Sequence, residues 1–123
     1  MTMKTGWLLA VALCAGLAQA QANERAIQVQ VVNGQIQVPE QTVRAGRQVG
    51  SFRWELATPG FTFPANGIVI DGGAFHNCKP IAQGRRFQCI RKGYQPGAQY
   101  KYDVNVNKGN QPLPTLDPII QNE

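Results

Sequence analysis

The residues best suited to metal binding lie close together around a single histidine. His76 is the only histidine of the chain, and Cys78 follows it two residues later. On a β-strand, residues two apart point to the same face, so His76 and Cys78 could join Cys89 around a zinc ion. A structural zinc site takes four ligands, and the fourth would have to come from Asp71 or another distant residue. Ligand count therefore favours a histidine beside a disulfide bond, and we expect neither a metal nor another cofactor.

Catalysis would need a more complete set of side chains than this sequence contains. A nucleophile requires a neighbouring base and a group that orients the base. Ser51 is the only serine, and its pattern places it on the outer face of a strand. The sequence has no GxSxG, HExxH, paired-carboxylate or phosphate-loop motif. We therefore expect a protein that is not an enzyme. The alternative is a small exported enzyme that uses Asp71 and His76 as an acid–base pair.

Basic residues form the clearest candidate for a binding surface. Between Gly72 and Tyr102 the sequence has six lysines and arginines and no acidic residue. Such a charge distribution favours anionic partners, namely lipopolysaccharide, an anionic glycan or an acidic protein surface, although it could also serve solubility alone. Nucleic acid is not favoured, because a groove for single strands interleaves aromatic residues with the basic ones. The candidate anionic-binding patch consists of Lys79, Arg85, Arg86, Arg91 and Lys92.

The first twenty residues have the features of an export signal. Lys4 supplies a positive charge, residues 7–17 are apolar and uncharged, and Ala18-Gln19-Ala20 is a small-x-small cleavage motif. The apolar run is too short to span a bilayer, which takes about 20 residues. We therefore expect residues 1–20 to be a cleaved signal peptide. The mature protein is then periplasmic or extracellular and does not span a membrane.

Export determines how the remaining cysteines are interpreted. Cys14 leaves with the signal peptide, and so do both methionines, Met1 and Met3. Cys78 and Cys89 remain as an even pair in an oxidising compartment, where a disulfide is expected. A loop of this size gains about 3 kcal/mol of stability from such a bond. The mature chain keeps eleven Lys and Arg against seven Asp and Glu, a net charge of +4.

The elements that must position these side chains are short β-strands. The clearest is a hairpin over residues 26–38, in which apolar residues alternate with glutamines on both sides of Asn33-Gly34. Asn-Gly suits the two positive-φ positions of a type I′ turn. A two-residue loop sets Val31 opposite Ile36, so the apolar residues of both strands share one face.

Similar alternation predicts the remaining strands. Inward positions fall on Phe52, Trp54 and Leu56, and again on Phe87 and Cys89. The longest alternating pattern of the chain follows, with one face formed by Tyr100, Tyr102, Val104 and Val106. No window has the 3.6-residue apolar period of an amphipathic helix. We therefore predict an all-β protein, a small antiparallel β-sandwich of about seven strands with one disulfide, built as an immunoglobulin-like or cupredoxin-like Greek key. The predicted strands beyond the hairpin cover residues 48–56, 68–70, 74–78, 85–91 and 100–107.

The beginning of the mature chain resembles the cupredoxins, small exported proteins with a copper centre. The resemblance rests on Val31-Val32-Asn33-Gly34, Val38-Pro39, Val43-Arg44-Ala45-Gly46 and Val49. It implies a β-sandwich of that kind. A blue-copper centre, however, takes one thiolate, two imidazoles and usually an axial methionine. With one histidine and no methionine after export, the chain lacks these ligands, and we expect no copper.

The mature chain is expected to form one β-sandwich domain over residues 21–110. Beyond it, Pro112, Pro114 and Pro118 cannot donate hydrogen bonds within a central strand. Residues 111–123 are therefore expected to form a proline-rich C-terminal arm, either packed along a sheet edge or loose. Together these observations predict an exported, non-catalytic binding domain for an anionic component of the cell envelope. The alternatives are the small enzyme described above and an inhibitor or immunity-type protein.

Overall fold

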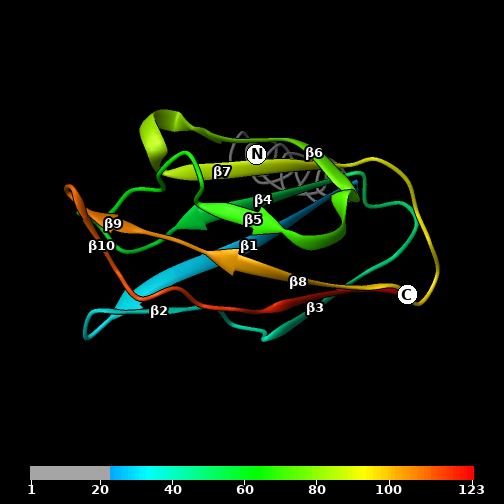
Figure 1. The fold of residues 1–123 in the computed structure, drawn as a ribbon, viewed down its shortest axis with the longest axis horizontal. Helices are drawn as coiled ribbons and strands as arrows, with labels where there is room; N and C mark the ends of the chain where they lie inside the picture. The colour runs from blue at the N-terminus through cyan, green and yellow to red at the C-terminus, as the bar shows by residue number, and fades with distance from the viewer. Residues whose placement is uncertain (1–22) are drawn as a thin grey trace, which may run out of the picture.

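Two β-sheets face each other across the core of the structure, a computed structural model that describes residues 23–123 (Figure 1). The predicted signal peptide lies outside these residues. The first sheet has five strands in the order β2-β1-β4-β7-β6, and the second has four in the order β3-β11-β8-β5. A short ribbon of β9 and β10 completes the architecture. The all-β class predicted from the sequence is confirmed.

The strands are mostly short. The five-stranded sheet contains β1 (Glu24–Val32), β2 (Gln35–Gln37), β4 (Ser51–Leu56), β6 (Phe75–Ile81) and β7 (Arg86–Arg91). The four-stranded sheet contains β3 (Thr42–Ala45), β5 (Ile68–Ile70), β8 (Gln99–Val104) and β11 (Ile119–Asn122), and the ribbon pairs β9 (Asn107–Lys108) with β10 (Gln111–Pro112). Two 3-10 turns, η1 (Asp71–Gly73) and η2 (Ala82–Gly84), flank β6. Within the described part of the chain, no helix has the length and apolar composition needed to cross a membrane.

The predicted hairpin is confirmed in register. Val31 lies opposite Ile36 in the antiparallel pair of β1 and β2. Asn33 and Gly34 have φ angles of 53° and 74°, which are the left-handed values that a type I′ turn requires. Because side chains alternate between the two faces, this register buries Val29 and Ile36 together and leaves the glutamines in solvent.

Aromatic residues from both sheets meet in the core. Trp54 of β4 and Tyr102 of β8 are 0% and 1% exposed, and their ring centroids lie 5.4 Å apart. The indole nitrogen of Trp54 donates a hydrogen bond of 3.4 Å to the Tyr102 hydroxyl. Burial raises the pKa of Tyr102 to about 12, an effect that this hydrogen bond partly opposes. The alternating pattern of the sequence therefore identified the inward residues of β4 correctly, and also those of β8 from Tyr102 onward.

Each of the two larger sheets contains one parallel pair of strands. β1 runs parallel to β4, with Ile27 opposite Trp54, and β11 runs parallel to β3, with Ile120 opposite Val43. Alternation of apolar residues determines which face of a strand is buried but not the direction of its neighbour. The described residues also form eleven strands rather than about seven, because several of the additional strands are too short to show a period.

The C-terminal residues do not form the peripheral arm that we expected. β11 lies inside the four-stranded sheet, between β3 and β8. Ile120 is fully buried, and Asn122 is only 1% exposed. The prolines at 112, 114 and 118 all precede β11, so they do not interfere with its hydrogen bonds. The apolar Ile119-Ile120 pair is short enough to escape a search for alternation.

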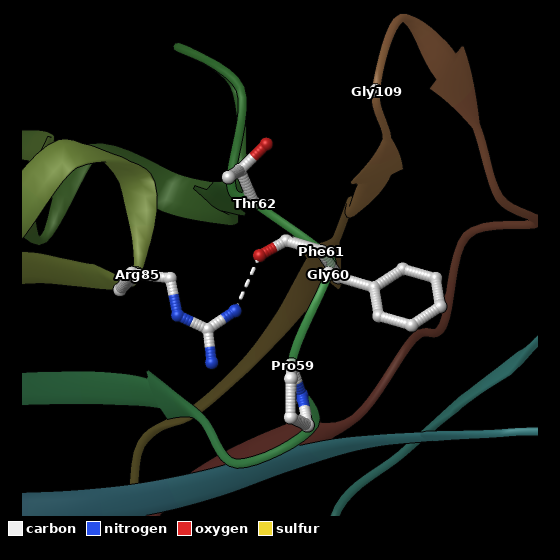
Figure 2. Close-up of a pocket in the computed structure, with 6 residues that line it drawn as sticks. All are labelled: Pro59, Gly60, Phe61, Thr62, Arg85 and Gly109. Carbon is white, nitrogen blue, oxygen red and sulfur yellow. Dashed lines mark hydrogen bonds between the residues drawn. The ribbon is translucent and has the colours of Figure 1, made fainter.

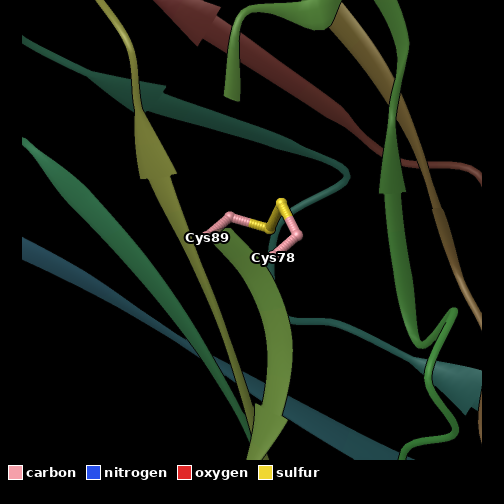
Figure 3. The surroundings of a disulfide bond; sticks show 2 residues. All are labelled: Cys78 and Cys89. Atoms are coloured by element: carbon pink, nitrogen blue, oxygen red, sulfur yellow. A yellow bond between two sulfur atoms is a disulfide. The ribbon is translucent and has the colours of Figure 1, made fainter. Parts of the chain in front are cut away.

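The predicted disulfide joins Cys78 of β6 to Cys89 of β7 (Figure 3). β6 is an edge strand, and its pairing with β7 is irregular between His76 and Lys79. Asn77 in this bulge has a φ of 51°. The bond therefore fastens an irregular edge strand to a strand whose inward residues, including Cys89, are fully buried.

Candidate functional site

The five basic residues proposed as one patch take up different environments. Lys79 and Arg86 lie in β6 and β7, whereas Lys92 follows β7 at its other end. The side chains of Arg85 and Arg91 donate hydrogen bonds to backbone carbonyls of the protein itself, which leaves them less available to a ligand than Lys79, Arg86 and Lys92. Charge in the sequence indicates where cations are dense, but hydrogen bonding to distant carbonyls determines which of them remain available.

Arg85 holds a loop in place. One terminal nitrogen of its guanidinium donates to the carbonyls of Thr58 and Phe61, and the other donates to the carbonyl of Leu56 at 2.8 Å. Figure 2 shows the guanidinium beside the Phe61 carbonyl. The loop lines an open pocket of about 450 Å³, together with Thr62 and Gly109. Since the charged nitrogens already bind backbone oxygens, we assign Arg85 a structural role.

Arg86 belongs to a ladder of alternating charges on the five-stranded sheet. Its Nε lies 3.4 Å from a carboxylate oxygen of Glu55. Arg53 lies 3.5 Å from Glu55 and 2.6 Å from Glu24. Lys79 stands opposite Gln88 on the next strand. Cations and carboxylates thus balance one another over much of this surface, which weakens its attraction for an anion.

Arg91 is a buried cation. The residue is 8% exposed, and its guanidinium carbon lies 5.3 Å from the ring centroid of Phe52 and 5.4 Å from that of Tyr94. One terminal nitrogen donates to the Gly46 carbonyl at 3.0 Å, while Nε and the other terminal nitrogen have no partner among the described residues. Burial lowers the pKa of Arg91, and the nearby Tyr94 and Tyr100 partly oppose that effect.

Lys92 lines a different pocket, which lies at the end of the sandwich. This pocket has a volume of about 280 Å³, and we call it the Tyr94 pocket. The loop that joins β7 to β8 forms part of it and lies at the same end of the molecule as the C-terminus (Figure 1). The pocket therefore lies between the ends of strands from both sheets. Its lining residues are Ala74, Lys92, Gly93, Tyr94, Gln95 and Tyr100.

Positive charge accumulates around Tyr94. The guanidinium carbon of Arg47 lies 4.9 Å from its ring centroid, and the buried Arg91 lies on the same ring. The salt bridges of residues 23–123 involve other arginines and leave Arg47, Arg91 and Lys92 without a carboxylate partner. An aromatic ring attracts cations through the negative potential of its face. Tyr94 therefore gathers two guanidinium groups beside a pocket that already contains a lysine.

Tyr100 forms the opposite aromatic wall. Its ring packs edge-on against Phe75, with centroids 5.7 Å apart and planes at 89°. Gly72 lies next to the ring, where a Cβ atom would come within 3.7 Å of Tyr100 Cδ1. Neither the hydroxyl of Tyr100 nor that of Tyr94 has a hydrogen-bond partner in the described part of the chain. The ring of Tyr100 is thus held from one side and stays half-exposed on the pocket side.

The residues of the enzyme alternative do not meet. Asp71 in η1 and His76 in β6 are both exposed, and no hydrogen bond of the described residues joins them. Ser51 pairs with Ile90, which pairs with His76, so a whole strand separates serine from histidine, about 10 Å at the usual strand spacing. Residues 23–123 also contain no group of three His, Cys, Asp or Glu side chains placed to hold a metal ion.

Two residues at the Tyr94 pocket are not predictable from local sequence, namely Arg47, which contacts the Tyr94 ring, and Tyr100, which lines the pocket. Arg47 follows β3 and reaches Tyr94 in the loop before β8, and no local pattern links such distant positions. Tyr100 has the inward parity of Tyr102, which predicts a core residue. Because it stands near the start of β8, where the sandwich ends, its ring lines a pocket instead.

Comparison with protein-family models and with curated proteins identified no relative of this chain. The chain matches no protein-family model, and no curated protein matches it.

Proposed function

We propose that this protein is an exported, non-catalytic binding domain that holds an anionic ligand in the Tyr94 pocket. The observation that carries the proposal is the meeting of Lys92 with two tyrosines in one open pocket, beside two arginines that contact Tyr94. Unpaired cations attract an anion, and aromatic walls supply apolar contact once the anion is bound. The ligand class that fits is an anionic component of the cell envelope.

The Tyr94 pocket supports this function better than the outer face of the five-stranded sheet. Arg86 and Arg53 on that face are within 3.5 Å of Glu55, so an anion there would compete with carboxylates of the protein. Lys92 in the pocket is exposed and has no salt bridge in residues 23–123. A ligand would therefore replace only water at Lys92, which makes the pairing less costly.

Export is part of the proposal and rests on residues 1–20 of the sequence. The disulfide between Cys78 and Cys89 is consistent with an oxidising compartment. The intact mass of the protein recovered from the exporting cells should match residues 21–123 less two hydrogens. Recovery of the uncut chain would contradict export.

The binding test uses two variants with the same change in charge. In Arg47→Gln/Lys92→Gln the charge is removed at the pocket, and in Lys79→Gln/Arg86→Gln it is removed from the sheet face. The probes are lipopolysaccharide and an acidic polysaccharide, at about 0.1 M and about 1 M salt, where the screening length is about 10 Å and about 3 Å. Circular dichroism of both variants verifies that the fold is intact.

We expect binding that weakens strongly with salt and that depends on the pocket pair. A charge-assisted hydrogen bond contributes about 1.5–3 kcal/mol, so the pocket variant should lose affinity by about tenfold or more. The sheet-face variant should lose much less. An equal loss in both variants would indicate general attraction between charges and would overturn the proposal, as would binding that is insensitive to salt or absent for every anionic probe.

A further inference from the structure

We infer that the ligand of the Tyr94 pocket is an acidic sugar, whose ring lies on the face of Tyr100 while its carboxylate pairs with Lys92. This inference rests on the proposed function and adds the chemical class of the ligand. Lys92 and Tyr100 line the same pocket, so one small ligand can contact both. The volume of about 280 Å³ suits a ring-sized group and is small for a larger organic ligand.

The two tyrosines of the pocket are not equivalent as stacking surfaces. Two guanidinium groups already lie over Tyr94, at 4.9 Å and 5.4 Å from its ring centroid. Tyr100 has no cation over its ring in the described residues, and its contact with Phe75 is through an edge-to-face packing. A sugar ring presents C–H groups of slightly positive charge, which are attracted to the negative face of an aromatic ring. Tyr100 is therefore the stacking residue.

The chain next to Tyr100 leaves room for such a ring. β5 ends at Ile70, which pairs with Tyr102, so on this side of β8 the next inward position, Tyr100, faces the η1 turn and no strand. Two of the three η1 residues are glycines, Gly72 and Gly73, and both have positive φ angles. No side chain from this turn can therefore cover the ring of Tyr100, apart from that of Asp71 at its start.

Polar groups around the pocket fit hydroxyls better than a bare phosphate. The Gln95 side chain is exposed at the rim, and an amide can both donate and accept hydrogen bonds. The unpartnered phenol hydroxyls of Tyr94 and Tyr100 have the same ability. A phosphate group needs donors alone, whereas sugar hydroxyls use donors and acceptors together. The mixture of one cation, two phenols and one amide therefore favours a sugar acid.

The test compares three probes with the exported protein. The first is an oligosaccharide of uronic acids, the second is a neutral oligosaccharide of the same length, and the third is polyphosphate. Proton NMR of the sugar reports stacking, because an aromatic ring current shifts protons above its face upfield. The variants are Tyr100→Phe, which keeps the ring, Tyr100→Leu, which removes it, and Lys92→Gln.

We expect the uronate oligosaccharide to bind and its ring protons to shift upfield. Tyr100→Phe should keep the shift, which makes the inference testable even where Tyr100→Leu is too unstable to study. Tyr100→Leu should abolish the shift and weaken binding by about fivefold to tenfold, the size of one aromatic contact. Lys92→Gln should weaken binding and reduce its dependence on salt.

The possible failures are distinguishable. Binding of polyphosphate but not of the uronate would overturn the sugar assignment and leave the anion-binding function intact. Uronate binding without an upfield shift, or with full affinity in a folded Tyr100→Leu variant, would also overturn it. If none of the anionic probes binds, the proposed function and this inference fail together.

Discussion

The guanidinium of Arg91 lies 5.3 Å from the centroid of the Phe52 ring, inside the fold and not in solvent. Arg91 belongs to the same cluster of basic residues in the sequence as its neighbour Lys92, yet only Lys92 is exposed. Arg91 supports Tyr94 from within, and Lys92 reaches the pocket. Of these two adjacent cations, Arg91 thus supports the structure of the site, and Lys92 remains free to bind a ligand.

Two substitutions of Arg91 should have different effects. Arg91→Ala removes packing against two rings and a hydrogen bond to Gly46, and should lower the free energy of unfolding by about 2–3 kcal/mol. Arg91→Met keeps much of the volume and removes a charge that burial disfavours, so its cost should be smaller. Urea unfolding measures both values. Equal losses would mean that packing around the side chain contributes little.

Arg85 is expected to be important for stability and its neighbour Arg86 is not. Arg85→Ala leaves the carbonyls of Leu56, Thr58 and Phe61 without this donor and should cost about 2–4 kcal/mol. Arg86→Ala loses one partly exposed salt bridge to Glu55 and should cost at most about 1 kcal/mol. Chemical denaturation of the two variants makes the comparison. Similar losses would show that the Arg85 bonds do not hold the loop.

The two cysteines should respond unequally to substitution. Losing the disulfide costs about 3 kcal/mol in either case. Cys89→Ser also buries a hydroxyl at a position that is 0% exposed, and this should add about 1–3 kcal/mol. Cys78→Ser places its hydroxyl in solvent and should carry no such addition. Thermal unfolding of both variants beside the reduced wild type gives the difference, and equal stability of the two would contradict the burial argument.

Tyr102 should make the fold sensitive to alkaline pH. Its pKa is about 12 in the folded protein, raised by burial, and about 10 in the unfolded chain. The folded state therefore keeps the Tyr102 proton to a higher pH than the unfolded chain does. The contribution of the protonated side chain to the free energy of unfolding is complete below pH 10 and is lost as the pH rises towards 12. The slope approaches about 1.4 kcal/mol per pH unit in that range. Tyr102→Phe should show a shallower decline in urea unfolding measured against pH; an unchanged slope would rule out this residue as the cause.

The C-terminal strand should be essential for folding. Ile120→Ala removes a fully buried side chain and should cost about 2–5 kcal/mol. Ile119→Ala, at a half-buried position of the same strand, should cost less. Deletion of residues 119–123 should abolish the folded state, because β3 then loses its partner strand β11. A folded deletion variant would instead support a dispensable arm.

Local patterns in the sequence determined much of the fold. The Asn33-Gly34 turn and its alternating flanks were sufficient to predict the hairpin with its register. The alternation around Trp54 and around Tyr102 identified the buried faces of two central strands. Such features can be predicted from the sequence because a turn and a two-residue alternation both depend on residues that are neighbours in the chain. The Cys78–Cys89 pair was predictable for a different reason, since these are the two cysteines that remain outside the predicted signal peptide.

Only the tertiary structure decided which cations could form a site. Arg85 and Arg86 are adjacent in the sequence, but one binds distant carbonyls and the other pairs with Glu55. Arg47 comes to lie over the ring of Tyr94 because the sandwich brings it to a loop that is remote in the chain. β11 likewise became an interior strand through partners in β3 and β8. These outcomes depend on contacts between distant segments, and neither charge nor periodicity within one segment specifies them.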